Sequence, residues 1–181
     1  MENQLFQNKY RIKSTRLKHW DYSSCGAYYI TICTKNREPF LGKITNEKMK
    51  LSEIGEIVKN CWLAIPQHYP NVTLDEFVIM PDHMHGLIFI DDLSFVETCH
   101  GMSLQTRTRT YNKFSQPVSQ SLSMIINHFK SAVKRWCNKN GFQNFAWQTR
   151  FHESILRNEK HLNTIREYII NNPLEFEKQN Q

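Results

Sequence analysis

The chain of 181 residues is 40% hydrophobic and 22% charged, which is enough for one compact domain with a hydrophobic core over residues 1–181. Its formal net charge of +6 favours acidic partners such as nucleic acid. The five cysteines form no C-x-x-C pair, so they indicate neither a disulfide framework nor a zinc knuckle. No apolar run approaches the ~20 residues of a membrane span, and we expect a cytoplasmic protein without a membrane partner.

Basic and aromatic side chains are interleaved in the N-terminal segment, residues 9–22. Arg11, Arg16 and Lys18 are candidate DNA contacts, because basic groups bind phosphates and the aromatic rings between them can stack on bases. A solvated basic arm would have the same composition, and both interpretations stay open.

The first half of the chain predicts a strand, a hairpin and a helix. Residues 27–34 are rich in β-branched and aromatic side chains and predict a strand, and residues 36–39 follow as a turn. Residues 43–51 predict a small hairpin. Apolar residues then recur at helical spacing over residues 54–65, until Pro66, which predicts an amphipathic helix packed on a sheet.

Two apolar, β-rich runs follow, at residues 74–80 and 85–90. They are separated at Pro81 and Asp82, which predicts adjacent strands or one hairpin. Residues 91–118 then lose the periodicity and gather Thr, Ser, Gln, Arg and Asn, a composition typical of a flexible loop. We interpret this segment as an insertion and not as a second domain.

The last third of the chain predicts two helices with a strand between them. Apolar residues recur at helical spacing over residues 122–136, and Gly141 is a stop signal. A final strand is predicted at residues 147–156. The last helix is predicted to begin near Asn158 and to end at Pro173. Its buried face is expected to contain Leu162, Ile165, Ile169 and Ile170.

This order of elements predicts an α+β fold. The strands and helices are compatible with an antiparallel sheet that is covered by helices on one face. We therefore expect a ferredoxin-like core, with the last helix at the C-terminal end.

His83 and His85 stand two residues apart at the start of the second apolar run. Alternate residues of a strand project from one face, so both imidazoles can reach one metal ion while Met84 points into the core. Two partly exposed histidines at a turn are the alternative, because an isolated H-x-H spacing is weakly specific.

Tyr168 and Asn172 lie four residues apart on the predicted last helix and therefore share one face. The Asn172 amide oxygen is a hard metal ligand, and two imidazoles with one oxygen leave coordination positions open. A metal held there could polarise a phosphate while Tyr168 attacks it, and the aryl phosphodiester so formed stores the energy of the cleaved bond. A surface or half-buried helix tyrosine without chemistry is the alternative.

Three ordered motifs carry a resemblance to a known family. They are EFVIMPDHMHG at residues 76–86, WQTRF at residues 147–151 and REYIINNP at residues 166–173. ITICTKNR at residues 30–37 also matches. Together they resemble the REP-associated tyrosine transposases, relatives of the single-tyrosine insertion-sequence transposases of the HUH (His-hydrophobic-His) class. The resemblance runs from about Arg11 to Pro173, outside the loop at residues 91–118.

The resemblance implies a function and the residues that carry it. His83 and His85 match the paired metal ligands, Asn172 the third ligand and Tyr168 the nucleophile. Family members cut single-stranded DNA near hairpins in transposition and recombination, form a 5′-phosphotyrosine and release a 3′-hydroxyl, usually with Mg²⁺ or Mn²⁺. The implied protein is a nucleoid-associated DNA endonuclease of the cytoplasm.

The sequence departs from the family pattern at two positions. Asp82 replaces a frequent Asn, and Ser154 replaces a frequent His. Neither is a proposed ligand. Nearby His152 is a candidate to compensate for Ser154, and a strand-surface residue is the alternative.

Further DNA contacts are predicted in the last third of the chain. Trp147 and Gln148 could bind an unpaired base, although a tryptophan that enters a strand is equally a core anchor. Lys130, Lys134 and Arg135 could follow phosphates, and a solvated charged helix face is the alternative.

Other enzyme classes fit less well. Leu87 stands where a histidine-triad hydrolase needs His and a metallo-β-lactamase-type site needs Asp, and no repeated H-x-T motif supports a two-histidine phosphoesterase. A non-catalytic single-stranded nucleic-acid-binding module and a domesticated DNA-processing relative stay open. A homodimer is also open, in which Tyr168 of one chain lies beside His83 and His85 of the other.

Overall fold

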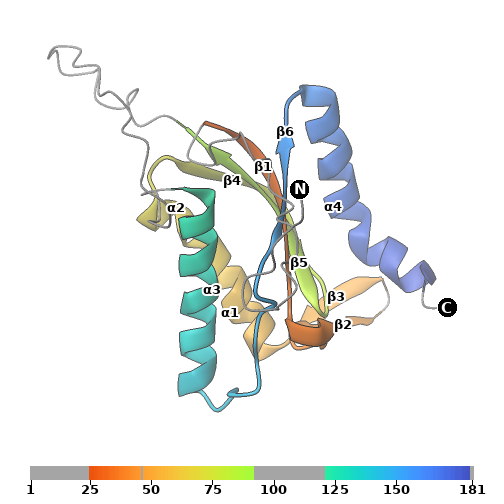
Figure 1. Cartoon of the computed structure of the whole chain (residues 1–181). Coiled ribbons are helices and arrows are strands. Elements are labelled where there is room, and N and C mark those ends of the chain that lie inside the picture. The colour runs from red at the N-terminus through yellow and green to blue at the C-terminus, as the bar shows by residue number, and fades with distance from the viewer. Residues whose placement is uncertain (1–24, 46, 92–120, 180–181) are drawn as a thin grey trace, which may run out of the picture.

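The computed structural model describes residues 25–45, 47–91 and 121–179 (Figure 1). The predicted basic arm, with Arg11, Arg16 and Lys18, lies outside the described residues, and so does the predicted insertion loop apart from its first residue. No helix in the described ranges is long and apolar enough to cross a membrane.

Four antiparallel strands form the central sheet, in the order β4-β5-β1-β6. They are β1 (Gly26–Cys33), β4 (Val72–Ile79), β5 (His83–Ile90) and β6 (His152–Leu156). Helix α1 (Glu53–Leu63) lies between β1 and β4 in the chain, and helix α3 (Leu122–Lys139) lies between β5 and β6. This βαββαβ order confirms the α+β class and the ferredoxin-like core.

The other elements lie around this core. A 3₁₀ turn, η2 (Lys35–Arg37), follows β1, and the strands β2 (Gly42–Thr45) and β3 (Lys48–Leu51) form a separate hairpin. The short helix α2 (Ile65–His68) follows α1, and the long helix α4 (Glu159–Gln179) ends the described chain. Ser52 begins α1 as its cap, since its hydroxyl accepts from Gly55 N at 3.1 Å.

One face of the sheet packs against α1 and α3. Met84, Ile88 and Ile90 of β5 are almost fully buried in this core, because alternate residues of a strand face the same side. Gly86 belongs to the same face, and a Cβ there would stand 2.3 Å from Cζ2 of Trp62 in α1. Glycine therefore lets the indole approach the strand backbone.

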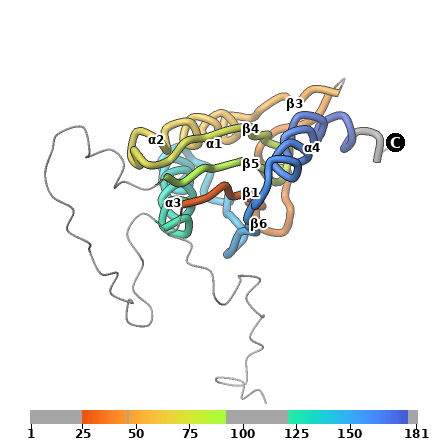
Figure 2. Tube along the Cα trace, turned by 90° about the horizontal axis from the view of Figure 1, so that it is seen from above, coloured from red at the N-terminus to blue at the C-terminus, as the bar shows by residue number. Residues whose placement is uncertain are grey.

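The second face of the sheet packs against α4 (Figures 1 and 2). Leu87 of β5, Leu156 of β6 and Ile169 of α4 form a buried apolar cluster there. The expectation that helices cover one face only is therefore wrong. The strands also carry apolar side chains on this second face, and the apolar stripe of α4 removes them from water.

Three predicted details are also wrong. β6 begins at His152, and Trp147 instead forms an isolated bridge to Thr34. Helix α4 does not end at Pro173 but continues past it and changes direction in its last turns (Figure 1). Proline removes one backbone donor and crowds the preceding turn, which bends a helix without always ending it. Ile170, expected in the buried face of α4, is 60% exposed.

Candidate active site

The β4–β5 hairpin carries the histidine pair. Its turn closes with a hydrogen bond from Met80 N to His83 O at 2.8 Å, with Pro81 and Asp82 at the tip. Thr34 anchors the tip, because its backbone N–H and its side-chain hydroxyl both donate to the Asp82 carbonyl at 2.9 Å. The first histidine is therefore fixed against the end of β1.

His83 and His85 share the face of the sheet that α4 covers. They are only 6% and 5% exposed. Their Nε2 atoms lie 3.1 Å apart, and their ring centroids lie 4.7 Å apart with the planes at 78°. Met84 between them is buried on the opposite face, as predicted. The two imidazoles thus present neighbouring nitrogen atoms to one point.

A carboxylate and a guanidinium hold His83. Asp82 Oδ1 lies 2.5 Å from His83 Nδ1, and Asp82 Oδ2 lies 3.0 Å from Arg37 Nε. Asn36 and Arg37 both have positive φ, 56° and 58°, which is uncommon for residues other than glycine. Arg37, which contacts Asp82 at the hairpin tip, is thus the second of two successive residues with a left-handed backbone. Such backbone strain often marks functional sites.

Two hydroxyl groups of β1 hold His85. Thr31 is its direct cross-strand partner, and Tyr29 lies two residues earlier on the same face. The Nδ1 atom of His85 lies 2.7 Å from Tyr29 Oη and 2.9 Å from Thr31 Oγ1. The Tyr29 ring also stacks on the imidazole, with centroids 5.5 Å apart and planes at 22°. These contacts occupy Nδ1 and leave Nε2 toward His83.

Burial keeps both imidazoles uncharged at neutral pH. Burial is the main cause that lowers the pKa of His85 from 6.5 to about 3, and the proximity of His83 and Arg37 contributes to the same shift. Burial also lowers the pKa of His83, although the hydrogen bond and the charge of Asp82 oppose this shift. Burial raises the pKa of Tyr29 to about 12, so this phenol stays protonated. Neutral imidazoles keep the lone pairs that metal ligation requires.

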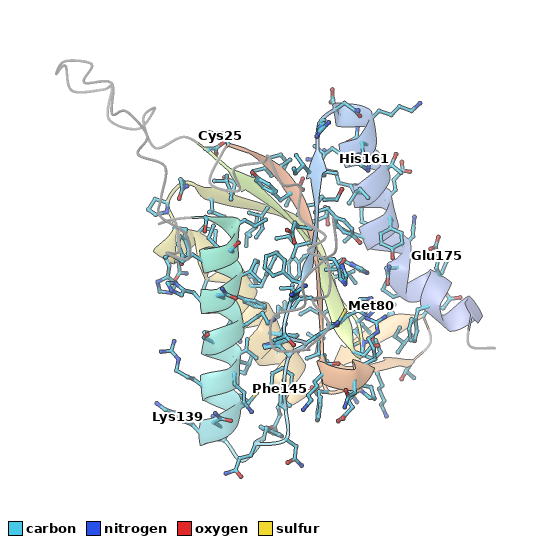
Figure 3. All side chains as sticks on the ribbon, in the orientation of Figure 1. Cys25, Met80, Lys139, Phe145, His161 and Glu175 are labelled. Carbon is cyan, nitrogen blue, oxygen red and sulfur yellow. The ribbon has the colours of Figure 1, made fainter. Side chains whose placement is uncertain are left out.

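Side chains of α4 meet those of the sheet (Figure 3), and Tyr168 of α4 has a ring contact with His85. Its ring centroid lies 5.4 Å from that of His85 and 6.4 Å from that of Tyr29. The residue is 40% exposed, so a substrate can reach its phenol. Asn172, one helical turn later, is 7% exposed. The structure thus brings Tyr168 beside the pair and buries Asn172 one turn away.

The donor set fits one divalent ion. With the Nε2 atoms 3.1 Å apart, an ion about 2.1 Å from each would hold them at an angle of about 95°, close to that of neighbouring octahedral ligands. In the part of the chain that the structure describes, no group of three His, Cys, Asp or Glu side chains could hold a metal. Among the described residues a third ligand would therefore be of another type, and the Asn172 amide oxygen stays the prediction.

Helix α4 is fixed on the sheet by an apolar stripe and by an ion pair. The stripe contains Leu162, Ile165 and Ile169. Arg166 Nε lies 2.8 Å from Asp75 Oδ2 of β4, and another guanidinium nitrogen contacts the same oxygen. At about 100° per residue, Arg166 and Tyr168 lie on opposite flanks of the stripe. The ion pair therefore resists the rotation of α4 that would move Tyr168 away from His85.

Five of the predicted DNA-contact residues line one groove beside α3, with a volume of about 490 Å³. They are Lys130, Lys134, Arg135, Trp147 and Gln148. None of the nine residues that line this groove is acidic. The ammonium groups of Lys130 and Lys134 also donate to backbone carbonyls within residues 143–150, so both lysines fasten this segment to α3. A DNA contact at the groove stays a prediction.

The groups that hold the histidines were not found from the motifs. Tyr29 and Thr31 contact His85 only because β1 and β5 pair in this register, and Arg37 reaches the hairpin tip across a turn. A signal was present, since Thr31 and Arg37 belong to the matching stretch at residues 30–37.

Ser154, which departs from the family pattern, and nearby His152 lie on the same face of the sheet as His83 and His85. Ser154 pairs with Tyr29, and His152 pairs with Thr31, in the register of β1 and β6. Both side chains are exposed. His152 is thus placed on the correct face of the sheet, and its compensating role stays a prediction.

No known family model matches the sequence. A protein of Haemophilus influenzae, named as uncharacterized, is 42% identical to the chain over 167 residues, which cover 92% of the chain and 90% of that protein. The chain belongs to the family of this protein. The match covers 92% of the chain, so it includes the four-stranded sheet and the histidine hairpin.

One solved structure shows the fold of the chain. A REP-associated tyrosine transposase bound to a REP hairpin matches with a TM-score of 0.59 at 17% identity, covering 91% of the chain and 74% of the transposase. The family therefore has the fold of this transposase, which confirms the fold that the motifs implied. A candidate transposase from Deinococcus radiodurans matches with a TM-score of 0.45 at 14% identity, over 87% of the chain and 97% of that protein, which does not establish a common fold.

Proposed function

We propose that the protein cuts and rejoins single-stranded DNA through a 5′-phosphotyrosine at Tyr168, at hairpin or palindromic elements, in DNA transposition. The observation that carries the proposal is the convergence of His83 and His85, with Nε2 atoms 3.1 Å apart, beside the accessible Tyr168 ring. The fold shared with a transposase bound to a REP hairpin supports hairpin-bearing DNA as the substrate.

In the proposed cleavage step the Tyr168 phenol attacks a DNA phosphodiester. A bond forms between Tyr168 Oη and phosphorus, and the bond from phosphorus to the 3′-oxygen breaks. The phenolic proton passes to water, and the departing oxygen takes a proton from water to become a 3′-hydroxyl. Attack of a DNA hydroxyl on the phosphotyrosine reverses this exchange and restores the phenol. Rejoining needs no external energy, because a phosphoester bond is kept throughout.

His83, His85 and Asn172 would hold Mg²⁺ or Mn²⁺. When bound, such an ion supplies Lewis-acid chemistry that polarises a phosphoryl oxygen and offsets negative charge on the leaving group. The contacts from β1 and from Asp82 hold both imidazoles in place before DNA arrives. Burial keeps the Tyr29 phenol protonated, and the 40% exposed Tyr168 is the phenol that we propose reacts with DNA.

The groove beside α3 would extend the DNA contact. Its three basic side chains suit a phosphate backbone, and Trp147 and Gln148 suit an unpaired base. The basic arm at residues 9–22 would add further phosphate contacts. Binding through these groups should weaken as the salt concentration rises, because counterions compete for the phosphates.

The test is a covalent adduct assay with the full-length protein, Mn²⁺ and an oligonucleotide in which a hairpin is flanked by single strands. The wild type should form a DNA–protein adduct that survives denaturation. Tyr168→Phe should lose the adduct and keep its fold, because the change removes one hydroxyl from a partly exposed residue. Tyr69→Phe removes a phenol that contacts His128 of α3, on the other side of the sheet, and is the matched control.

A chelator arm and His85→Ala test the proposed metal. Both should remove the adduct and leave salt-sensitive DNA binding largely intact. Equal adduct levels in Tyr168→Phe and the wild type would overturn the nucleophile, and full cleavage in chelator would overturn the metal. DNA binding without any adduct would instead support the non-catalytic binding module.

A further inference from the structure

We propose that the two histidines differ in where they keep their proton: Asp82 locks His83 with its proton on Nδ1, whereas the hydroxyl groups of β1 let His85 move its proton from Nε2 to Nδ1 when a divalent cation binds. Asp82 is then a positioning residue that keeps Nε2 of His83 free for a metal ion, whereas His85 must change its tautomer to bind one. The inference rests on the metal role of the pair within the proposed function, and it does not depend on DNA cleavage.

The Asp82 carboxylate determines the tautomer of His83. A carboxylate accepts hydrogen bonds and donates none, so the 2.5 Å contact requires a proton on His83 Nδ1. Arg37 holds the other carboxylate oxygen at 3.0 Å and also donates to Cys33 Sγ at 3.0 Å, which fixes the direction of the pair. The Nε2 atom of a neutral His83 therefore carries a free lone pair.

The same reasoning places the proton of metal-free His85 on Nε2. The two Nε2 atoms are 3.1 Å apart, which is a hydrogen-bond distance, and one of them must donate. Since His83 Nε2 has no proton, His85 is the donor, and the single lone pair of its Nδ1 accepts from the hydroxyl of Tyr29 or of Thr31. A hydroxyl group can donate or accept, so the partners on β1 do not lock this tautomer.

Binding of a cation between the Nε2 atoms requires a change at His85 alone. Its Nε2 proton leaves to water, and its Nδ1 takes up a proton from water, so the imidazole stays neutral. The protonated Nδ1 then donates to the hydroxyl of Tyr29 or Thr31, which rotates to accept. His83 needs no such change, because its proton already lies on Nδ1.

The residue at position 82 decides whether the lock exists. Asparagine at this position could accept from His83 through its oxygen or donate to it after an amide rotation. It would therefore leave two tautomers of His83 available. The carboxylate of Asp82 removes that choice, and its charge strengthens the hydrogen bond.

NMR of the full-length protein with ¹⁵N-labelled histidine tests the assignment, first in chelator and then with Zn²⁺ as a diamagnetic probe. We expect His83 to be protonated at Nδ1 in both states. We expect His85 to be protonated at Nε2 in chelator and at Nδ1 with Zn²⁺. A proton on His83 Nε2 in chelator, an unchanged His85 or an absence of Zn²⁺ binding would each overturn the proposal.

Variants of Asp82 separate positioning from a merely structural role. Asp82→Asn should admit a second His83 tautomer and weaken Mn²⁺ binding by about 10-fold, and Asp82→Ala should weaken it more. Glu38→Gln removes an exposed carboxylate shortly after the same turn and is the matched control. A structural role alone would change stability and leave the tautomer of folded His83 unchanged, which would contradict the inference.

The outcome can be separated from that of the adduct assay. If the tautomers behave as proposed while Tyr168 forms no adduct, the proposed function fails and this inference stands. If Tyr168 forms the adduct while His83 and His85 are protonated at the same ring nitrogen in chelator, this inference fails and the proposed function stands.

Discussion

At the scale of single residues, His85 couples the stability of the protein to pH. In the unfolded chain its pKa is the ordinary 6.5, whereas burial lowers the pKa in the folded protein to about 3. Between these two values the unfolded chain binds the additional proton. The free energy of unfolding therefore falls as the pH falls through this window, and it is unaffected by His85 above it.

The metal-free protein should lose about 2 kcal/mol of unfolding free energy through His85 when the pH falls from about 7.5 to about 5. Urea unfolding in chelator at these two pH values measures the loss. His85→Gln should lack this part of the pH dependence, and His161→Gln, which changes an exposed histidine of α4, should retain it. The same pH dependence in His85→Gln and the wild type would contradict a buried, neutral imidazole.

Strand alternation was sufficient to predict that His83 and His85 share a face and that Met84 is buried opposite. It could not predict the contacts of Tyr29 and Thr31 with His85, because those residues lie 56 and 54 positions away in the chain. Their approach depends on the register of β1 against β5, which is set by the packing of the whole sheet.

At the scale of elements, α4 holds Tyr168, the proposed nucleophile, beside the histidine pair through two kinds of contact. The apolar stripe sets the distance of the helix from the sheet, and the pair between Arg166 and Asp75 sets its rotation. Because Tyr168 lies on the other flank of the stripe, a small rotation of α4 changes its position relative to His85. Under the proposed function, we therefore expect the loss of the ion pair to affect DNA cleavage more than stability.

Asp75→Asn and Arg166→Gln should each slow adduct formation by about 10-fold, since misplacement by about 1 Å is costly to a positioned nucleophile. The free energy of unfolding should change by about 1 kcal/mol or less, because the pair is partly exposed. Single-turnover adduct kinetics and urea unfolding provide the two measurements. Lys160→Gln, an exposed position on the same helix, is the control. Wild-type kinetics in both variants would show that the apolar stripe alone places Tyr168.

Helical spacing was sufficient to predict α4 and the full or partial burial of the three residues of its apolar stripe, Leu162, Ile165 and Ile169. The face of the sheet that it covers was not predictable, because an amphipathic pattern shows that a helix packs on something and does not show on what. Ile170 was wrongly expected to be buried for the same reason. Whether Ile170 is buried depends on the width of the contact between α4 and the sheet, and helical periodicity does not predict that width.

At the scale of the whole molecule, one chain supplies every residue of the candidate site. The order of strands and helices was sufficient to predict a ferredoxin-like core, because short connections and right-handed crossovers leave few arrangements of such elements. The meeting of Tyr168 with the histidine pair was implied by the motifs, and the docking of α4 on the second face is what brings it about.

A site within one chain predicts that inactive variants cannot rescue each other. An equimolar mixture of His85→Ala and Tyr168→Phe should form no more adduct than either variant alone. In a dimer that exchanged α4, some sites would combine the intact pair of one chain with the intact Tyr168 of the other. Recovery of adduct in the mixture would therefore contradict the arrangement within one chain.

The mass of the modified peptide tests most directly whether Tyr168 bonds covalently to DNA. The adduct formed with Mn²⁺ and hairpin-bearing DNA is denatured and digested with nuclease and protease, and the remaining peptides are sequenced by mass spectrometry. We expect a nucleotide attached through its 5′-phosphate to Tyr168, and a free 3′-hydroxyl on the released strand. Attachment at another residue, Tyr29 included, or a released 3′-phosphate would contradict it.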